Sequence, residues 1–466
     1  MYKTRSVAEK GPLLLTVSGD FMRTIHSLLS FARRRIVQIV LWFYTAGSKL
    51  RQQREVRGER QPRFESDEIV VPAHGDMYAI VVKYAGHGES ANLHVLLDAL
   101  RRAQVNTVLV CNGEVPPEEL RALSQRVHRV MVRRNIGRDF GAYRAATLSL
   151  LSQGVKPERM MYFNDSLLYI EGTELDRLVA EFIFSEFDVV GLGENQYQHH
   201  VGSYALSVSG AAFTHPKFRQ FWQDYIPYDL RKHTIHAGEL GLTGVLKDLS
   251  CSIDVVYDVT RLARKLGSMP LHEVVDAMRW LPFGFRRHAL MDVLGQSISA
   301  RGMILNAGAL EGSAAAHDAP AAGQRPAGTP TLGAMRSLRD ADGRVALLNR
   351  ETPAVRATPK TSASEGMAQS AQRLSRQLLI DHILEHVTNG SQLHFGFGLF
   401  YRLLGCPVVK RDLFSRGLYR EHDCADILDN VPAPTRQRLL RDLINRGRLD
   451  MQLGRWRGML FRNGML

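Results

Sequence analysis

The most informative segment of this sequence is Arg134-Asn135-Ile136-Gly137-Arg138-Asp139-Phe140-Gly141-Ala142-Tyr143. It follows an apolar β-type run, Val130-Met131-Val132, and turns through its glycines into a helical pattern. A strand that ends in glycines at the beginning of a helix presents unpaired backbone N–H groups, which can bind a phosphate. We therefore predict an anion-binding turn between a strand and a helix.

A second motif, Met160-Met161-Tyr162-Phe163-Asn164-Asp165-Ser166, follows shortly afterwards and ends an apolar strand in a carboxylate. At a strand end, Asp165 can place one oxygen on a hard cation, Mg²⁺ or Mn²⁺, that bridges a phosphate. Alternatively, Asp165 caps the N-terminus of a helix. Together the two motifs indicate a nucleotide-sugar site in which Asp165 is the metal ligand.

The composition predicts a large folded protein with an anionic partner. A chain of 466 residues with 45% hydrophobic content can bury one large core and form two folded units. The net charge of +13 favours a phosphorylated substrate, an anionic lipid or a nucleic acid. We expect no nucleic-acid partner, because aromatic residues are not interleaved with the basic clusters. The four cysteines lie far apart without CxxC spacing, which argues against a zinc site and fits a reducing compartment.

The N-terminal region, residues 1–50, is amphipathic. An apolar run, Ile36 to Tyr44 with Trp42 and Phe43, is flanked by the basic residues 33–35 and by Lys49, and Phe31 precedes the first basic group. The run is shorter than the roughly 20 residues needed to cross a bilayer. It predicts either an interfacial helix on an anionic membrane or a packed N-terminal helix with a solvated basic tail. No convincing secretory signal is present, so we expect a cytoplasmic protein at the inner face of the cell membrane.

The rest of the chain divides by composition. Residues 51–75 are charged and are predicted to be a linker, whereas 76–310 alternate short apolar strands with helical patterns. This alternation predicts an α/β fold with a mostly parallel central sheet that helices cover on both faces. Residues 311–370 are rich in Ala, Pro, Gly and Ser and are predicted to be a disordered linker. Helical patterning returns over 371–466, and we expect this segment to complete the acceptor site.

Two other motif interpretations fail. Asp139-Phe140-Gly141 spells the magnesium motif of protein kinases, but no HRD loop, VAIK-type lysine or APE accompanies it. The glycines do not form GxGxxG, which disfavours a dinucleotide-binding fold.

The motifs resemble those of the rhamnan synthesis protein F family of glycosyltransferases. The resemblance covers roughly residues 76–260, with a weaker match at Gly405-Cys406-Pro407-Val408-Val409-Lys410-Arg411-Asp412-Leu413. The segments that carry it are Lys83-Tyr84-Ala85, the RNIGRDFGAY stretch, Phe163 to Ser166, His200 to Tyr204, Phe218 to Trp222 and Gly238-Glu239-Leu240.

The resemblance implies a GT-A-like nucleotide-sugar-binding fold and an enzyme that builds surface polysaccharide. The implied donor is a nucleotide sugar such as dTDP-rhamnose, and the implied acceptor is a growing or lipid-linked glycan. The usual Asp-x-Asp metal motif is reduced here to Asp165, so a catalytically inactive nucleotide- or glycan-binding module is the alternative.

The candidate site residues follow from the motifs and the resemblance. We expect Glu239 and Asp165 to be catalytic. If the sugar is transferred with inversion, Glu239 is the candidate base, although a first-turn carboxylate favoured by the helix dipole explains it equally. Asp139 either contacts the nucleotide or caps a helix. The residues expected to bind the donor are Lys83, Tyr84, Arg134, Asn135, Gly137, Arg138, Asp139, Tyr143, Asn164 and Ser166.

Basic and imidazole side chains near these motifs have two interpretations each. Arg133, Arg134 and Arg138 either neutralise the leaving diphosphate or form a solvated rim. His199, His200 and His236 are candidate metal ligands, but an ordinary surface or core position explains each of them as well.

Overall fold

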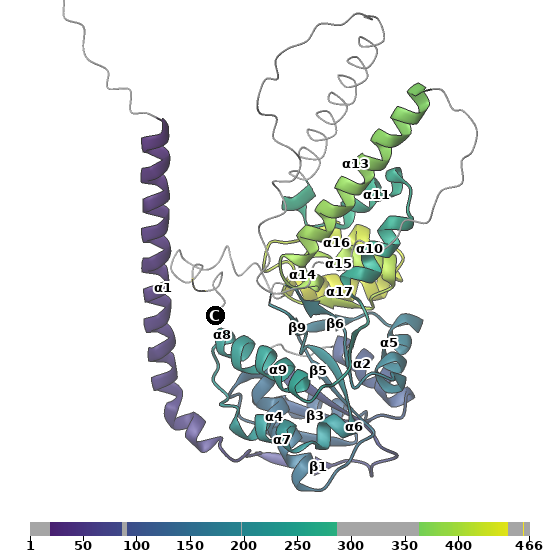
Figure 1. Cartoon of the computed structure of the whole chain (residues 1–466). Helices are drawn as coiled ribbons and strands as arrows, with labels where there is room; N and C mark the ends of the chain where they lie inside the picture. The colour runs from purple at the N-terminus through teal and green to yellow at the C-terminus, as the bar shows by residue number, and fades with distance from the viewer. Residues whose placement is uncertain (1–18, 86–90, 197, 287–362, 446–459, 461–466) are drawn as a thin grey trace, which may run out of the picture.

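An eight-stranded sheet forms the centre of the computed structural model, which describes residues 19–85, 91–196, 198–286, 363–445 and 460 (Figure 1). Its strand order is β1-β4-β3-β2-β5-β10-β7-β11, and four of the seven pairings are parallel. The strands are β1 (Ser66–Ile69), β2 (Met77–Tyr84), β3 (Asn106–Asn112), β4 (Arg129–Arg133), β5 (Arg159–Asn164), β7 (Val189–Gly191), β10 (Ala205–Ser209) and β11 (Ile253–Val255). The predicted α/β fold with a mostly parallel sheet is confirmed.

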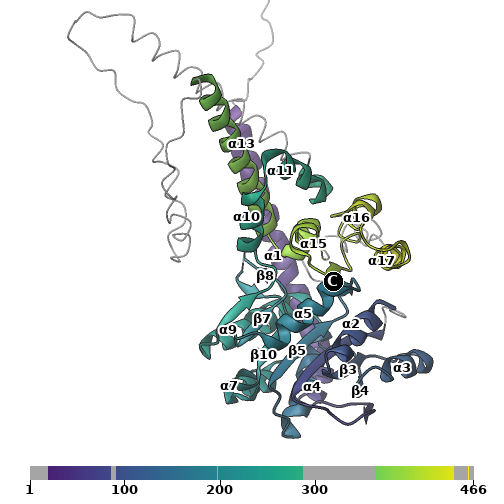
Figure 2. The same cartoon turned by 90° about the vertical axis from the view of Figure 1, so that its right-hand side faces the viewer.

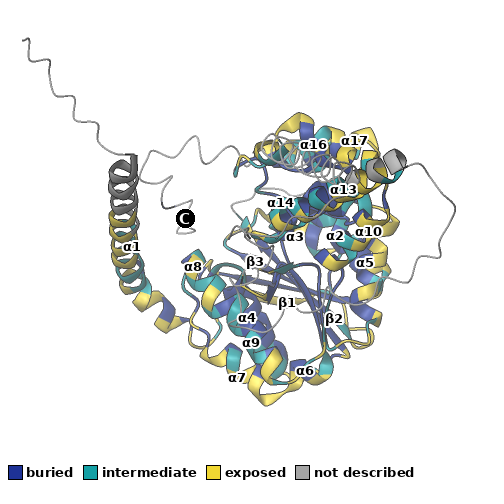
Figure 3. Ribbon diagram, turned by 45° about the horizontal axis from the view of Figure 1, so that its top comes forward, coloured by how far each residue is buried: buried dark blue, intermediate teal, exposed yellow. Residues whose placement is uncertain are grey.

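Helices bury both faces of the sheet, as the continuous apolar strands require. On β2, Ala79 and Val81 join one core while Ile80 and Val82 join the other, because successive side chains point to opposite faces. Figure 3 shows the buried strands enclosed between two helical layers. One layer contains α2 (Ala91–Arg102), α3 (Pro117–Ser124), α5 (Thr173–Phe184) and α10 (Val259–Ser268); the other contains α4 (Arg138–Ser152), α6 (Gly210–Thr214), α7 (Pro216–Asp224) and α9 (Gly241–Asp248).

The strand order reverses between β2 and β5. From β2 the chain moves outward through β3 to β4, then returns to place β5 on the other side of β2. In open α/β sheets, ligands bind outside the carboxyl ends of the strands at such a switch point. The glycine motif follows the end of β4 at Arg133, and the second motif contains the end of β5 at Asn164, so both motifs reach the carboxyl edge of the sheet.

The C-terminal segment packs over the same edge. Its β12 (Val408–Lys410) pairs antiparallel with β6 (Leu167–Tyr169), which follows directly after β5. Figures 1 and 2 show the C-terminal helices grouped at one end of the molecule, above the sheet. They are α13 (Ala363–Thr388), α14 (Gln392–Phe395), α15 (Phe397–Leu404), α16 (Glu421–Ile427) and α17 (Ala433–Asn445), with α11 (Leu271–Ala277) beside them. The helical pattern predicted for this segment is confirmed over 371–445.

Two segment boundaries differ from the prediction. Residues 51–75 are not a linker: α1 (Gly19–Gly58) extends through the first part, and β1 pairs with β4 in the second. The charged composition of 51–75 indicated a solvated linker, but one of its charges, Glu59, is buried in an ion pair with Arg133. Residues 311–362 lie outside the described residues, and 363–370 already belong to α13.

Helix α1 carries an exposed apolar stripe. It contains Phe31, Ile36, Ile39, Trp42, Phe43 and Leu50, each 56–69% exposed. The later part of α1 contacts the body of the protein, where Gln52 hydrogen-bonds to Asp229 and Lys49 lies over the Tyr228 ring. Among the described residues, no helix is both long and apolar enough to cross a bilayer.

The buried Glu59–Arg133 ion pair gives a stability prediction. Arg133 is fully buried and donates to Glu59 at 3.0 Å, so Glu59→Ala leaves an uncompensated guanidinium in the core. We expect the free energy of unfolding, measured by urea denaturation, to fall by about 3–5 kcal/mol. The control Glu55→Ala, at an exposed position of the preceding helix α1, should change it by less than about 0.5 kcal/mol. Equal effects of the two substitutions would contradict this role for Glu59.

Candidate active site

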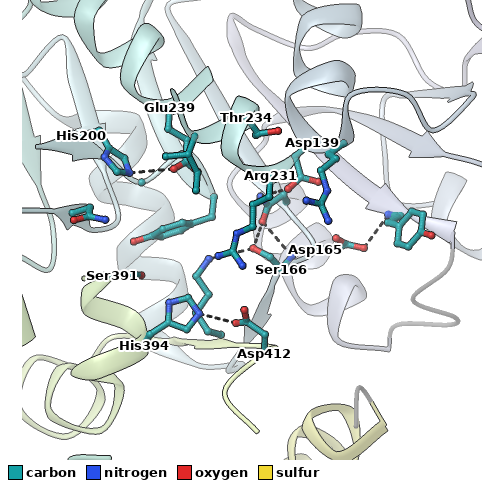
Figure 4. A pocket seen from close by; sticks show the side chains of 18 of the residues that line it. Asp139, Asp165, Ser166, His200, Arg231, Thr234, Glu239, Ser391, His394 and Asp412 are labelled. Atoms are coloured by element: carbon teal, nitrogen blue, oxygen red, sulfur yellow. Dashed lines mark hydrogen bonds and ion pairs between the residues drawn. The ribbon is translucent and has the colours of Figure 1, made fainter. Parts of the chain in front are cut away.

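A pocket of about 590 Å³ opens between the carboxyl edge of the sheet and the C-terminal segment (Figure 4). Its size suits a small-molecule ligand. The sheet side supplies residues from the ends of β2, β3, β4 and β5, and the facing side comes from positions 391–416. The lining includes Tyr84, Asn112, Asn135, Arg138, Asp139, Asn164, Asp165, Ser166, Glu194, His200, Tyr204, Arg231, Glu239, Ser391, His394, Lys410, Asp412 and Arg416.

The turn Asn164-Asp165-Ser166 joins the two strands at the switch point. Tyr84 N–H donates to Asp165 Oδ2 at 2.9 Å, which ties the end of β2 to the turn after β5. Asn164 Oδ1 accepts hydrogen bonds from the Ser166 N–H and hydroxyl, at 3.1 and 2.5 Å. The chain continues into β6 and not into a helix. Asp165 is therefore not a helix cap.

The glycine turn is fixed by close packing. Gly137 has a φ of +80°, and a Cβ there would lie 2.2 Å from the Pro227 Cβ. Its N–H donates to Asp229 Oδ1 at 2.6 Å, so this amide already has a carboxylate partner. Helix α4 begins at Arg138, and Asp139 in its first turn accepts a hydrogen bond from Asn164 Nδ2 at 2.8 Å. This hydrogen bond joins the two sequence motifs directly.

Several predicted donor-binding residues do not line the pocket. Lys83 is 1% exposed and pairs with Glu119 at 2.9 Å, because it continues the buried face of β2 beneath α3. Tyr143 is in the core, where its hydroxyl donates to the Ser203 carbonyl at 3.1 Å. Gly137 provides the positive φ of the turn but does not line the pocket. Arg134 is exposed to solvent and does not line the pocket either. Arg133, buried against Glu59, is neither a diphosphate ligand nor a solvated rim residue.

Glu239 lines the pocket from the middle of a helical run. It belongs to a π-helical segment, Thr234–Leu240, that continues α8 (Arg231–His233) into α9. It is therefore not a first-turn carboxylate, and the helix-dipole interpretation does not apply. Ser203 Oγ donates to Glu239 Oε1 at 2.9 Å, and His200 Nε2 lies 3.1 Å from Oε2. Single π turns are frequent at functional sites.

His200 forms a charged pair with Glu239. The His200 Nδ1 lies 2.6 Å from the Gln198 carbonyl, which only accepts, so Nδ1 carries a proton. Nε2 also needs a proton to donate to the carboxylate. Although burial lowers the pKa of His200, the Glu239 carboxylate outweighs it and raises the pKa above 6.5. For the carboxyl group of Glu239, burial has the opposite effect and raises the pKa. The hydrogen bonds from His200 and Ser203 outweigh burial and bring the pKa of Glu239 below its ordinary value.

The C-terminal segment supplies residues that the motif analysis did not single out. His394 Nε2 lies 2.8 Å from Asp412 Oδ1, and Arg416 Nε donates to Asp412 Oδ2 at 2.5 Å. Lys410 is buried, with its Nζ 3.3 Å from Ser166 Oγ and 3.8 Å from the centroid of the Tyr204 ring. The weak family match at 405–413 was the sequence signal that pointed to this region.

The donor set does not fit a divalent cation. Among the described residues, no three His, Cys, Asp or Glu side chains are grouped to hold a metal. The neighbours of Asp165 in the turn, Asn164 and Ser166, bond to each other, and the Lys410 ammonium lies 3.3 Å from Ser166 Oγ. The histidines do not add ligands: His199 pairs with Glu194 at the surface, and His236 is exposed.

Comparison with known proteins agrees with the motif analysis. Residues 107–278 match the model of the rhamnan synthesis protein F family. The resemblance to that family is confirmed. An uncharacterized protein of Sinorhizobium fredii, y4gN, is 26% identical over 213 residues, which are 44% of this chain. The chain spans about half of that relative, 55% of its length.

Solved glycosyltransferases also match part of the chain. GlyE of Streptococcus pneumoniae is 11% identical, with 39% of this chain and 45% of that chain covered and a TM-score of 0.26. A mannosyltransferase of Pyrobaculum calidifontis, solved with GDP-Man and Mn²⁺, is 11% identical, with 47% and 65% covered and a TM-score of 0.26.

The His200–Glu239 pair gives a titration prediction. In the wild-type protein, NMR titration should place the pKa of His200 above 6.5, and Glu239→Gln should lower it because the carboxylate that stabilises the imidazolium is removed. The stability from this raised pKa is complete below about 6.5 and is lost as the pH rises through the folded-state value. The control Glu194→Gln, which removes the partner of His199, should leave His200 unchanged. An unshifted His200 in Glu239→Gln would contradict the charged pair.

Proposed function

We propose that this protein is a glycosyltransferase that moves a sugar from a nucleoside diphosphate to a hydroxyl group of a glycan. The observation that carries this proposal is the meeting of the two motifs at the switch point, where Asp139 and Asn164 hydrogen-bond beside the pocket. The family match over 107–278 supports it. A catalytically inactive module with the same fold would keep this pocket but would not turn over a donor.

In the proposed reaction, the bond between the anomeric carbon and the diphosphate oxygen breaks, and its electron pair leaves with the diphosphate. The acceptor oxygen forms the new bond to the anomeric carbon and gives its proton to Glu239. The hydrogen bonds from Ser203 and His200 fix the position of this carboxylate. Its lowered pKa keeps it ionised at neutral pH, so it can accept a proton.

The donor and acceptor are proposed from the family. A rhamnosyl donor such as dTDP-rhamnose and a lipid-linked or growing surface glycan suit a relative of rhamnan synthesis protein F. We place the reaction in the cytoplasm at the inner face of the membrane, where such an acceptor is anchored. The side of the pocket that positions 391–416 line is the proposed acceptor side.

The exposed stripe of α1 is proposed to bind the anionic membrane surface. Trp42 and Phe43 are each 65% exposed, and the basic residues Arg35 and Lys49 lie on the same helix. Burying such aromatic side chains at the interface, together with about 1 kcal/mol for each basic residue near an anionic surface, provides reversible attachment.

Glu239→Gln tests the proposed base. The amide keeps the shape but cannot take the proton, so we expect turnover of the nucleotide sugar to fall by about 10²-fold or more while donor affinity is retained. The control Glu186→Gln, at an exposed position outside the pocket, should be fully active. Loss of donor affinity together with the rate would make Glu239 a binding residue. Absence of turnover in the wild type across a donor panel would support the inactive module.

Trp42→Ser combined with Phe43→Ser tests the membrane proposal. Because both side chains are exposed, the fold should be unaffected, and binding to vesicles that contain anionic lipid should be lost. The control Phe184→Ser removes an aromatic ring that is 78% exposed on α5 and should bind as the wild type does. Wild-type binding should weaken as salt rises, since the attraction is partly electrostatic. A wild-type protein that ignores anionic vesicles at low salt would overturn the proposal.

A further inference from the structure

Arg231 lines the pocket, and within the described residues no carboxylate pairs with it directly, although the charges of Asp412 and Glu239 raise its pKa. It extends from α8 into the pocket toward Ser166 (Figure 4). Within the described part of the chain it forms no ion pair or hydrogen bond through its guanidinium. By contrast, Arg416 pairs with Asp412, and the carboxylate of Glu239 is bonded to His200 and Ser203.

A guanidinium in this position is costly unless an anion joins it. Arg231 is half-buried. Burial, together with the positive charges of Arg416 and Arg138, lowers its pKa to about 10, although the carboxylates of Asp412 and Glu239 act in the opposite direction. It stays protonated at neutral pH, so its charge is present and poorly solvated. Buried charges in proteins are normally paired, and a perturbed cation in a pocket indicates a site for a negatively charged ligand.

Lys410 adds a second positive charge on the other side of Ser166. The backbone of β12 holds it in place, and its Nζ lies 3.3 Å from Ser166 Oγ. Burial lowers the pKa of Lys410 to about 8; Asp412 and Glu239 raise it, whereas Arg231 and Arg416 lower it further. Lys410 is therefore mostly charged at neutral pH.

The two cations occupy the region where a metal would be expected. Asp165 is the single carboxylate of the turn, and it already accepts the Tyr84 N–H. A hard cation needs several oxygen ligands, and a neighbouring ammonium group repels it. The side chains around the Asn164-Asp165-Ser166 turn therefore favour an anionic ligand over a divalent cation.

We propose that Arg231 and Lys410 neutralise the diphosphate of the sugar donor in place of a divalent cation. This rests on the proposed transferase function. As the bond to the anomeric carbon breaks, the electron pair passes to the diphosphate oxygen, and the guanidinium and ammonium groups stabilise the added negative charge. Arginine suits this role because its fork of N–H donors matches phosphate oxygens in a bidentate geometry.

Calorimetric titration of the full chain with dTDP, UDP and inorganic pyrophosphate tests the proposal. In excess EDTA, the wild type should bind, and Arg231→Gln should weaken binding about 10- to 100-fold because charge-assisted hydrogen bonds are lost. The control Arg264→Gln, on the exposed side of α10, should bind as the wild type does. Thermal unfolding checks that each variant is folded; if Arg231→Gln is not, Lys410→Met should show the same weakening.

The outcomes separate this proposal from the transferase function. Binding or turnover that requires added Mg²⁺ or Mn²⁺ and is unaffected by Arg231→Gln overturns the role of the two cations but leaves the transferase function standing. Pyrophosphate binding that depends on Arg231, without binding of either nucleotide, supports the anion site and counts against the donor. If no probe binds in EDTA, the anion site is wrong.

The pH dependence gives an independent measure of Lys410. Its charge is present below about 8 and is lost above it, so wild-type affinity for the diphosphate should decrease as the pH rises through this value. Lys410→Arg should remove the decrease, because an arginine stays charged. Unchanged pH dependence in Lys410→Arg would exclude Lys410 from the site.

Discussion

The pairing of β12 with β6 is the contact on which the pocket depends. Three backbone pairs, ending with Lys410 opposite Leu167, join the C-terminal segment to the strand directly after the Asn164-Asp165-Ser166 turn. The Arg411 N–H also donates to the Ser166 carbonyl at 2.9 Å. Residues 244 positions apart in sequence thereby meet at one turn. Without this pairing, the C-terminal segment would not cover the carboxyl edge of the sheet, and the pocket would lose the side that this segment lines.

Charge is distributed unevenly across the pocket. On one side, Glu239 is paired with His200; near the C-terminal wall, Asp412 is paired with Arg416 and His394. Arg231 has no such direct pair within the described residues, and Asp412 and Glu239 offset the cost of its burial only in part. A dianionic diphosphate would offset the rest, which links the electrostatics of the pocket to the chemistry of the proposed donor.

Local pattern was sufficient to predict the fold. The alternation of apolar strands and helices gave the mostly parallel sheet, and the end of one apolar strand gave Asn164 and Asp165 as candidates. Tyr84 was named from the family resemblance, and its N–H donates to Asp165. Asp139 came from the glycine motif, and its bond to Asn164 lies beside the pocket.

Residues that depend on distant packing were missed or misplaced. Lys83 adjoins a motif but points beneath α3, which strand alternation alone does not reveal without knowing where Glu119 lies. Arg231 belongs to no motif, and its position follows from the π-helical segment after it. Lys410 reaches the pocket because β12 pairs with β6, a strand that lies far from it in the sequence. The charged stretch 51–75 looked solvated because the partner of Glu59, Arg133, comes from β4.

A crystal structure of the full chain with a bound nucleoside diphosphate would show directly whether the two cations bind the diphosphate. We expect the diphosphate to lie beside the Asn164-Asp165-Ser166 turn, within hydrogen-bonding distance of Arg231 and Lys410. A diphosphate bound outside this pocket, or held by a metal ion on Asp165 with both cations turned away from it, would exclude this role for Arg231 and Lys410.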